Sequence, residues 1–133
     1  MANTNSHSPS RIIILGTTLL LGLAALVLIF APVEVASGLG FLDLRPAALV
    51  MELYGAALFG LAMTGWMVKD SVVGGIFGRS YVVGNASHAV VGAFALVRAV
   101  SASATPALMA LCALYCLLAI VFGYLMFAAS PTA

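Results

Sequence analysis

Long apolar stretches alternate with short polar segments along this chain. Four of the stretches are each about as long as the ~20 residues that a helix needs to cross a hydrocarbon core of about 30 Å. Their apolar residues are continuous and show no two-residue alternation, which favours helices over the strands of a membrane barrel. The pattern predicts an all-α fold, an integral membrane four-helix bundle with spans at about 12–31, 47–68, 81–100 and 107–128.

The polar segments carry residues that commonly end helices. Pro32 and Pro46 stand beside predicted helix ends, where the missing backbone N–H costs least. The connection 69–80 is rich in glycine, but it lacks the Lys-Ser/Thr pair of a phosphate-binding loop, so we interpret it as a connector. Segment Val33–Arg45 is still rather apolar, and we expect it to lie along the headgroup boundary as a short amphipathic piece.

A polar tail precedes the first span. The Ser and Asn content of residues 1–10 predicts a disordered N-terminal tail, and residues 11–133 then form a single four-span transmembrane domain. The first span follows Arg11 as the apolar part of a secretory signal would, and cleavage after Ala36 or Ser37 is the alternative. Its apolar run is longer than the ~7–15 residues usual in a signal, so we predict a retained helix.

Composition narrows the classes of function. Hydrophobic residues make up 64% of the chain and charged residues 7%, a balance far from that of a water-soluble domain. Short connections leave no room for a catalytic module outside the membrane. The net charge of +1, without a basic cluster, argues against binding of nucleic acid or anionic headgroups. The predicted partners are the lipid bilayer and either another membrane protein or a second copy of the chain.

Charged residues predict the orientation of the spans. An even number of spans places both termini on one side of the membrane. That side receives Arg11, Lys69 and Arg79, whereas the opposite side receives Arg45 and Arg98. Because cytoplasmic segments carry an excess of positive residues, we predict that both termini lie in the cytoplasm.

Polar and small residues form one stripe on the second span and another on the third. Each stripe recurs at intervals of three or four residues, which places its members on one helix face. Small residues let helix backbones approach closely in lipid, where hydrophobicity no longer drives association. The stripes are Glu52, Ala56, Gly60 and Thr64 in the second span, and Asn85, His88, Gly92, Ala95 and Arg98 in the third.

The two stripes predict an antiparallel hairpin of the second and third spans. A single register pairs each residue of the second-span stripe with one of the third-span stripe, and it places the turn near 73–76, inside the glycine-rich connection. The predicted neighbours are Thr64 with His88, Gly60 with Gly92, Ala56 with Ala95, and Glu52 with Arg98.

Glu52 has a structural and a functional interpretation. A charge near the centre of a span costs about 2.5–3.5 kcal/mol on insertion scales. An ion pair with Arg98 would offset that cost and hold the hairpin in register, and this is the interpretation we adopt. The alternative is a carboxylate that carries protons or cations, since intramembrane acids often mark transport pathways.

His88 has the same two kinds of interpretation. A proton relay, a haem ligand or a quinone contact would each use its imidazole. The only other histidine, His7, is in the polar tail, so one chain cannot supply two axial histidines within the bilayer. We therefore predict a packing histidine hydrogen-bonded to Thr64, and no cofactor or metal. Asn85 is expected to hydrogen-bond between helices.

The second span resembles a known family. Its run Glu52–Ala62, followed by Trp66 and the polar pair Lys69-Asp70, resembles the second span of small bacterial four-helix membrane proteins of the DoxX-like kind. The resemblance implies a four-helix bundle in a bacterial inner membrane and transfers no catalytic residue. Small multidrug-resistance transporters also have four helices and a membrane glutamate. Their acid lies in the first span, whereas the first span here has none.

These patterns lead to a prediction of function. We expect a small multi-pass membrane protein that is not an enzyme and that serves as a structural or accessory subunit of a membrane assembly. The alternative is a small proton-coupled transporter that uses Glu52 and works as a dimer. An enzyme or redox carrier built on His88 is a third class.

Overall fold

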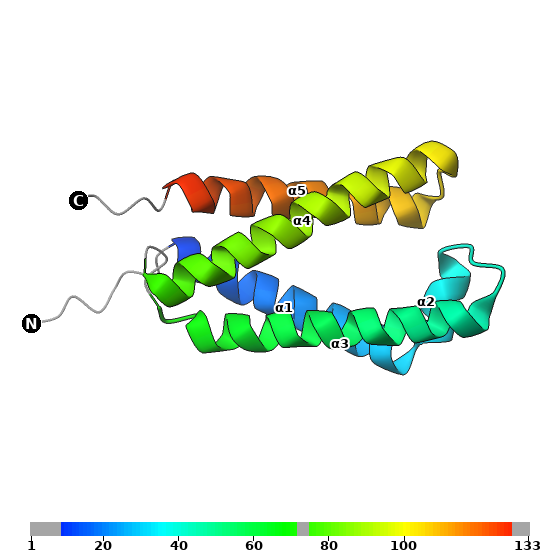
Figure 1. Ribbon diagram of the computed structural model, residues 1–133, viewed down its shortest axis with the longest axis horizontal. Helices are drawn as coiled ribbons and strands as arrows, with labels where there is room; N and C mark the ends of the chain where they lie inside the picture. Colours follow the sequence, from blue (N-terminus) through cyan, green and yellow to red (C-terminus); the bar gives the residue numbers. More distant parts are fainter. Residues whose placement is uncertain (1–8, 72–74, 129–133) are drawn as a thin grey trace, which may run out of the picture.

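The computed structural model describes residues 9–71 and 75–128, and over these residues the chain forms helices and no strand (Figure 1). Four of the helices are long and apolar enough to cross a membrane, which confirms the predicted all-α bundle and indicates a small membrane protein. The helices are α1 (Pro9–Phe30), α2 (Pro32–Gly38), α3 (Leu44–Val68), α4 (Ile76–Ala102) and α5 (Pro106–Ala128).

The helix boundaries differ from the predicted spans at several places. α3 begins at Leu44 rather than near residue 47, so Leu44 and Arg45 belong to the helix. The third span begins at Ile76 rather than near residue 81, so residues 76–80 of the predicted connector are helical. Of the tail predicted to be disordered, residues 1–8 lie outside the described part of the chain, whereas Pro9 and Ser10 already belong to α1. Proline in the first turn of α1 is compatible with a helix because its missing N–H would have no intrahelical partner there.

A short helix, α2, separates the first two spans. Pro32 occupies its first turn, and Ala36 is fully buried against the neighbouring helices. The chain leaves α2 through Gly40, whose φ of 86° lies in the left-handed region that glycine adopts at little cost. α2 thus covers the first part of segment 33–45, for which a short amphipathic piece was expected. Its position relative to the headgroups stays a prediction.

The four long helices are arranged as two pairs. α1 packs along α3, and α4 packs along α5, whereas α3 and α4 make few contacts and diverge from the connection that joins them (Figure 1). Close approach of α1 and α3 depends on glycine: a Cβ at Gly55 would lie 2.9 Å from Leu28 Cβ and 2.9 Å from Ile29 Cγ1. Small residues at such contacts are typical of helix packing in lipid.

Two buried clusters show where the pairs meet. The first cluster joins α1 to both α4 and α5 at the end of the bundle that holds the start of α1, and the second joins α1 to α3. The pairs are therefore held together at one end and are separate at the other. The clusters are Ile14, Tyr81, Val82, Ala86, Phe122 and Leu125, and Leu21, Ala25, Leu58 and Ala62.

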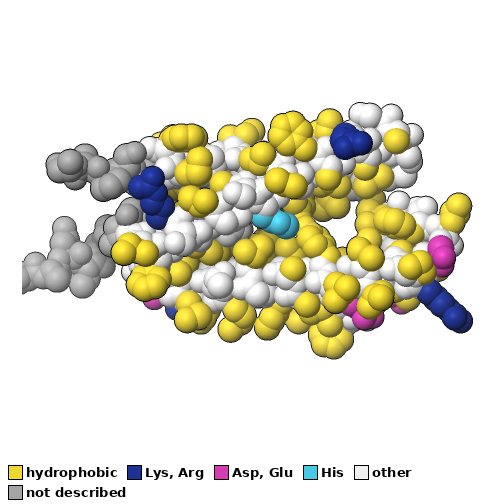
Figure 2. All heavy atoms as spheres, in the orientation of Figure 1, with side chains coloured by type: hydrophobic (Ala, Val, Ile, Leu, Met, Phe, Trp, Pro, Cys, Tyr) yellow, Lys and Arg dark blue, Asp and Glu magenta, His cyan; other side chains and the backbone are white. Residues whose placement is uncertain are grey.

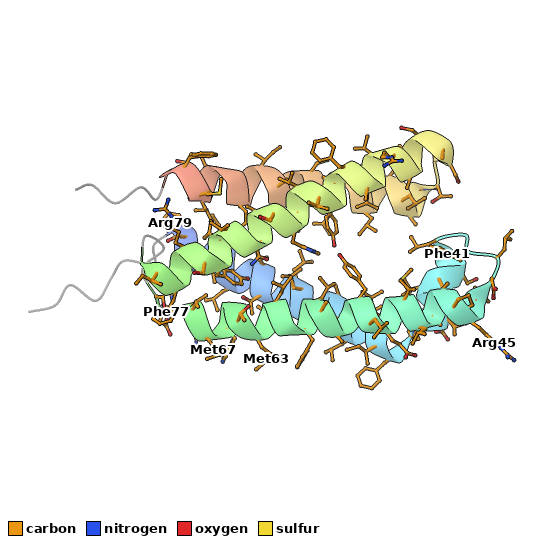
Figure 3. All side chains as sticks on the ribbon, in the orientation of Figure 1. Phe41, Arg45, Met63, Met67, Phe77 and Arg79 are labelled. Carbon is orange, nitrogen blue, oxygen red and sulfur yellow. The ribbon has the colours of Figure 1, made fainter. Side chains whose placement is uncertain are left out.

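Ion pairs lie at the end where the helix pairs meet. Arg11 at the start of α1 binds Asp70 after α3, with 3.0 Å between guanidinium nitrogen and carboxylate oxygen, and Lys69 lies 3.6 Å from the other oxygen of Asp70. Arg79 is at this same end, and Arg45 is at the opposite end, beside α2 (Figure 3). The start of α1 and the end of α3 therefore lie at the same end of the bundle.

Candidate functional site

Three polar side chains from three helices meet inside the bundle. Tyr54 of α3 and Tyr115 of α5 are hydrogen-bonded to each other through their hydroxyls. His88 of α4 completes the group, with its Nε2 3.3 Å from the Tyr54 hydroxyl and 3.2 Å from the Tyr115 hydroxyl. We refer to Tyr54, His88 and Tyr115 as the polar triad. It links both helix pairs across the space between them.

Hydrogen-bond capacity in the polar triad exceeds what its own contacts use. Each tyrosine hydroxyl has one donor and two acceptor sites, and the imidazole of His88 has a nitrogen on each side. The contacts among the three residues share the two hydroxyls and a single imidazole nitrogen. Either hydroxyl can rotate toward a bound molecule while the other still bonds to His88. The polar triad can therefore bind a ligand that accepts or donates a hydrogen bond.

Gly92 positions Tyr115 in the polar triad. A Cβ at Gly92 would collide with the Cδ1 and Cε1 atoms of the Tyr115 ring, so the ring lies directly on the backbone of α4. His88 is one helical turn before Gly92, and its ring centroid is 5.5 Å from that of Tyr115. The centroid of the Tyr54 ring lies 6.0 Å from that of His88, with an angle of 30° between the ring planes. The aromatic rings thus fix where the three polar atoms lie.

The polar triad lies at mid-depth in the spans. Tyr54, His88 and Tyr115 each stand near the middle of their helix. A helix of about this length crosses the whole hydrocarbon core, so its middle lies near the bilayer midplane. Water is scarce at that depth, and hydrogen-bonding groups there must find partners in the protein or in a bound molecule.

A cavity of about 1060 Å³ extends from the polar triad toward the end that holds α2. It is lined within residues 20–28 of α1, 51–58 of α3, 87–99 of α4 and 107–118 of α5, which are the halves of these helices where the pairs diverge. Figure 2 shows the molecule hollowed between the two helix pairs, with the histidine side chain at the inner end of the hollow. The cavity is therefore the space that the diverging pairs leave open.

The cavity lining is almost entirely apolar. Among the described residues, its polar side chains are the polar triad and Ser87, and they include no lysine, arginine, aspartate or glutamate. At the end away from the polar triad, Val35 of α2 and Leu39 and Phe41 of the following connection line it. Phe41 lies in that connection in Figure 3. A volume of this size is at the upper end of the ~300–1,000 Å³ usual for small-molecule sites.

Most of the stripe predicted on α4 faces the interior, but its predicted partners on α3 are all wrong. His88 belongs to the polar triad and does not contact Thr64, and Gly92 packs on Tyr115 rather than on Gly60. Asn85 is buried, yet its amide donates a 3.0 Å hydrogen bond to the Tyr81 carbonyl one turn earlier, so the predicted bond between helices is wrong. The remaining stripe residues are Ala95, which lines the cavity, and Arg98, which is exposed.

The stripe predicted on α3 faces outward. Its members are exposed, an added Cβ at Gly60 would meet open space, and the Thr64 hydroxyl donates to the Leu61 carbonyl of its own helix. The stripe is Glu52, Ala56, Gly60 and Thr64, and the inner face is Gly55, Leu58, Ala62 and Gly65. At about 100° per residue these two sets lie on opposite sides of α3. Ala56 and Ala95 are therefore not neighbours across a hairpin.

The predicted ion pair between Glu52 and Arg98 is wrong. Both side chains are exposed, and the ion pairs among the described residues are those of Asp70 with Arg11 and Lys69. The physical reason is the divergence of α3 from α4, which is greatest at the end where both charges lie. An inward carboxylate on α3 would also be desolvated against α1 without a partner.

Tyr54 and Tyr115 are site residues that the sequence analysis did not single out. A tyrosine near a helix end commonly anchors a span at the membrane surface, but both of these stand near the middle of their helices. A hydroxyl at mid-span needs a hydrogen-bond partner, and that depth is the signal that could have identified them. Among the described residues, no group of three or more His, Cys, Asp or Glu could hold a metal ion.

Comparisons with known proteins do not assign the chain to a family. No family model matches it, no curated protein matches it, and no solved structure matches it. The resemblance of the second span to DoxX-like proteins stays a prediction.

Proposed function

We propose that this protein binds a lipophilic molecule inside the bilayer, in the cavity between its two helix pairs. The observation that carries the proposal is an apolar, uncharged cavity with hydrogen-bonding side chains at its inner end. Small-molecule sites commonly combine a large apolar surface with a few polar groups that fix orientation. The cavity meets both conditions at a depth that a lipophile reaches from the membrane.

We propose that the protein binds this molecule without acting on it as an enzyme. The polar triad has hydroxyl and imidazole groups but no carboxylate beside them, and no charged side chain lines the cavity. A small binding protein of this kind would hold or present a lipophile to a larger membrane assembly, as an accessory subunit. We place it in a bacterial inner membrane with both termini in the cytoplasm. Arg11, Lys69 and Arg79 near one end of the bundle support that orientation.

A cavity-filling variant tests the proposal. Ala95 lines the cavity and is exposed to it, whereas Ala113 of α5 is exposed but lies outside the lining. Small lipophiles extracted from the purified protein should include one enriched species in the wild type and in Ala113→Phe, and that species should be lost in Ala95→Phe. Equal extracts from all three proteins would contradict the proposal.

A second candidate function is a proton-coupled transporter that uses Glu52. The separation of Glu52 from Arg98 favours it, because an acid without an ion-pair partner within a span is typical of transport pathways. Against it, Glu52 is outside the cavity lining, so a proton on this carboxylate would not reach a molecule in the cavity of the same chain. Loss of proton-driven flux in Glu52→Gln, with an unchanged lipophile extract, would support transport.

A further inference from the structure

We infer that the bound molecule is an uncharged lipophile with a hydroxyl or carbonyl group at one end, and that this polar end binds the polar triad at mid-bilayer while the apolar part extends toward α2. The inference rests on the proposed function and adds the chemical class of the ligand and its direction. Its basis is the position of the polar and apolar parts of the cavity along the bilayer normal.

The cavity favours an uncharged polar group. A charged headgroup at the polar triad would lose its hydration and find no oppositely charged side chain in the lining. The imidazole of His88 does not replace such a side chain, because its hydrogen-bond partners are two neutral hydroxyls and no carboxylate lines the cavity to stabilise an imidazolium. Phosphate, carboxylate and ammonium headgroups are therefore disfavoured at this depth.

The polar triad can nevertheless form a further hydrogen bond, which a purely apolar ligand does not offer. A hydroxyl or carbonyl transferred from water into an apolar site costs free energy unless it forms a hydrogen bond. The hydroxyls of Tyr54 and Tyr115 supply donor and acceptor sites for such a bond, and they face no competing charge. Because the net contribution of such a hydrogen bond is favourable, an alcohol or ketone is bound more favourably than an alkane of the same length.

The apolar part of the ligand has a defined direction. The polar triad is at mid-span, and the remainder of the cavity reaches Leu39 and Phe41 at the α2 end. The length of the cavity from the polar triad to the α2 end is about half of the ~30 Å hydrocarbon core, which is the depth of one leaflet. A membrane phospholipid has its polar group at the surface and its chain ends at the midplane. The ligand of this cavity is inferred to lie the other way round.

Three probes of equal chain length test the class of ligand. We would measure displacement of tritiated hexadecanol from the full-length protein in lipid nanodiscs by hexadecanol, hexadecane and hexadecyl phosphate. Hexadecanol should compete roughly tenfold better than either of the other two, as expected for one hydrogen bond gained without a buried charge. Tyr54→Phe and Tyr115→Phe keep the ring and should remove most of that preference, whereas Tyr124→Phe, on the exposed face of α5, should retain it.

The direction is tested with a hexadecanol analogue that carries a diazirine at the end of its chain. Irradiation should label the peptide that contains Leu39 and Phe41. Labelling of the peptide that contains His88 would show that the ligand lies in the opposite direction and would contradict the inference.

The outcomes separate this inference from the proposed function. Tighter binding of hexadecyl phosphate would overturn the inferred class and leave a cavity that binds lipophiles. Equal binding of hexadecanol and hexadecane in the wild type would overturn the role of the polar triad. Absence of saturable binding by every probe, together with identical lipophile extracts from wild type and Ala95→Phe, would overturn the proposed function itself.

Discussion

At the scale of residues, glycine matters most where an aromatic ring packs directly on a helix backbone. Gly92 is such a position because the Tyr115 ring occupies the place of its missing Cβ. Gly84 is on the same helix, and an added Cβ there would meet open space. The same substitution should therefore have different consequences at the two positions.

We expect Gly92→Ala to destabilise the protein by about 1–3 kcal/mol, the usual cost of overpacking. The new methyl would displace the Tyr115 ring and weaken the polar triad. Gly84→Ala is the matched control and should be neutral or slightly stabilising, because alanine loses less conformational freedom in a helix than glycine. Thermal unfolding in detergent measures both, and equal shifts would contradict the contact at Gly92.

Glu52 and Arg98 should contribute to stability independently. Both are exposed, on helices that diverge, so Glu52→Gln and Arg98→Gln should have additive effects. The interaction free energy from a double-mutant cycle should fall below roughly 0.5 kcal/mol. A larger favourable coupling would show that Glu52 and Arg98 form the ion pair predicted from the sequence, and it would contradict their separation in the structure.

At the scale of elements, the inner face of α3 determines how the first helix pair packs. Gly65 lies at a junction of three helices, where an added Cβ would collide with the Thr18 hydroxyl of α1 and lie 2.6 Å from the Tyr81 hydroxyl of α4. Both hydroxyls belong to buried residues. The junction therefore has no room for a larger residue than glycine.

We expect Gly65→Ala to lower the thermal stability of the protein and to be far more harmful than Gly60→Ala. Gly60 is on the same helix and faces open space, so its variant should behave like the wild type. The comparison tests which side of α3 packs inward. A greater loss of thermal stability for Gly60→Ala would show that the side of α3 with Glu52, Ala56 and Thr64 packs inward.

The spans could be predicted from the sequence, whereas the helix contacts could not. Hydropathy along the chain is sufficient for a span because the bilayer acts on each helix separately. Packing depends on which helix face is covered, and α3 has small residues on both sides, at Gly55 and Gly65 and also at Ala56 and Gly60. The small residues of α3 alone do not distinguish the two sides, and the polar residues Glu52 and Thr64 favoured the side that faces outward.

The candidate site was predictable only in part. His88 was recognised because it belongs to the stripe of polar and small residues on the third span. Its partners Tyr54 and Tyr115 are 34 and 27 residues away in the chain, on helices that belong to different pairs. Their proximity follows from the tertiary arrangement, which hydropathy and spacing do not encode. The cavity likewise follows from the divergence of the pairs.

At the scale of the whole molecule, the positive residues predict which end of the bundle faces the cytoplasm. The ion pair of Arg11 with Asp70 joins the start of α1 to the end of α3 at one end of the bundle. α2 is at the opposite end. In a background where Cys112 and Cys116 are replaced, cysteines introduced at residues 5 and 75 should react with an impermeant thiol reagent from the cytoplasm only. A cysteine at residue 38 should react only from the opposite side. Labelling of residue 38 from the cytoplasm would show that the protein has the opposite orientation.

Photo-crosslinking in the native membrane tests the central claim, that the space between the helix pairs is a binding site, most directly. The photoreactive residue p-benzoylphenylalanine would replace Leu96, which lines the cavity, or Phe94, which is 71% exposed and outside the lining. Irradiation followed by mass spectrometry should find one discrete, uncharged adduct at position 96 and a mixture of membrane phospholipids at position 94. The same phospholipid mixture at both positions would show that bulk lipid fills the space and would contradict the account.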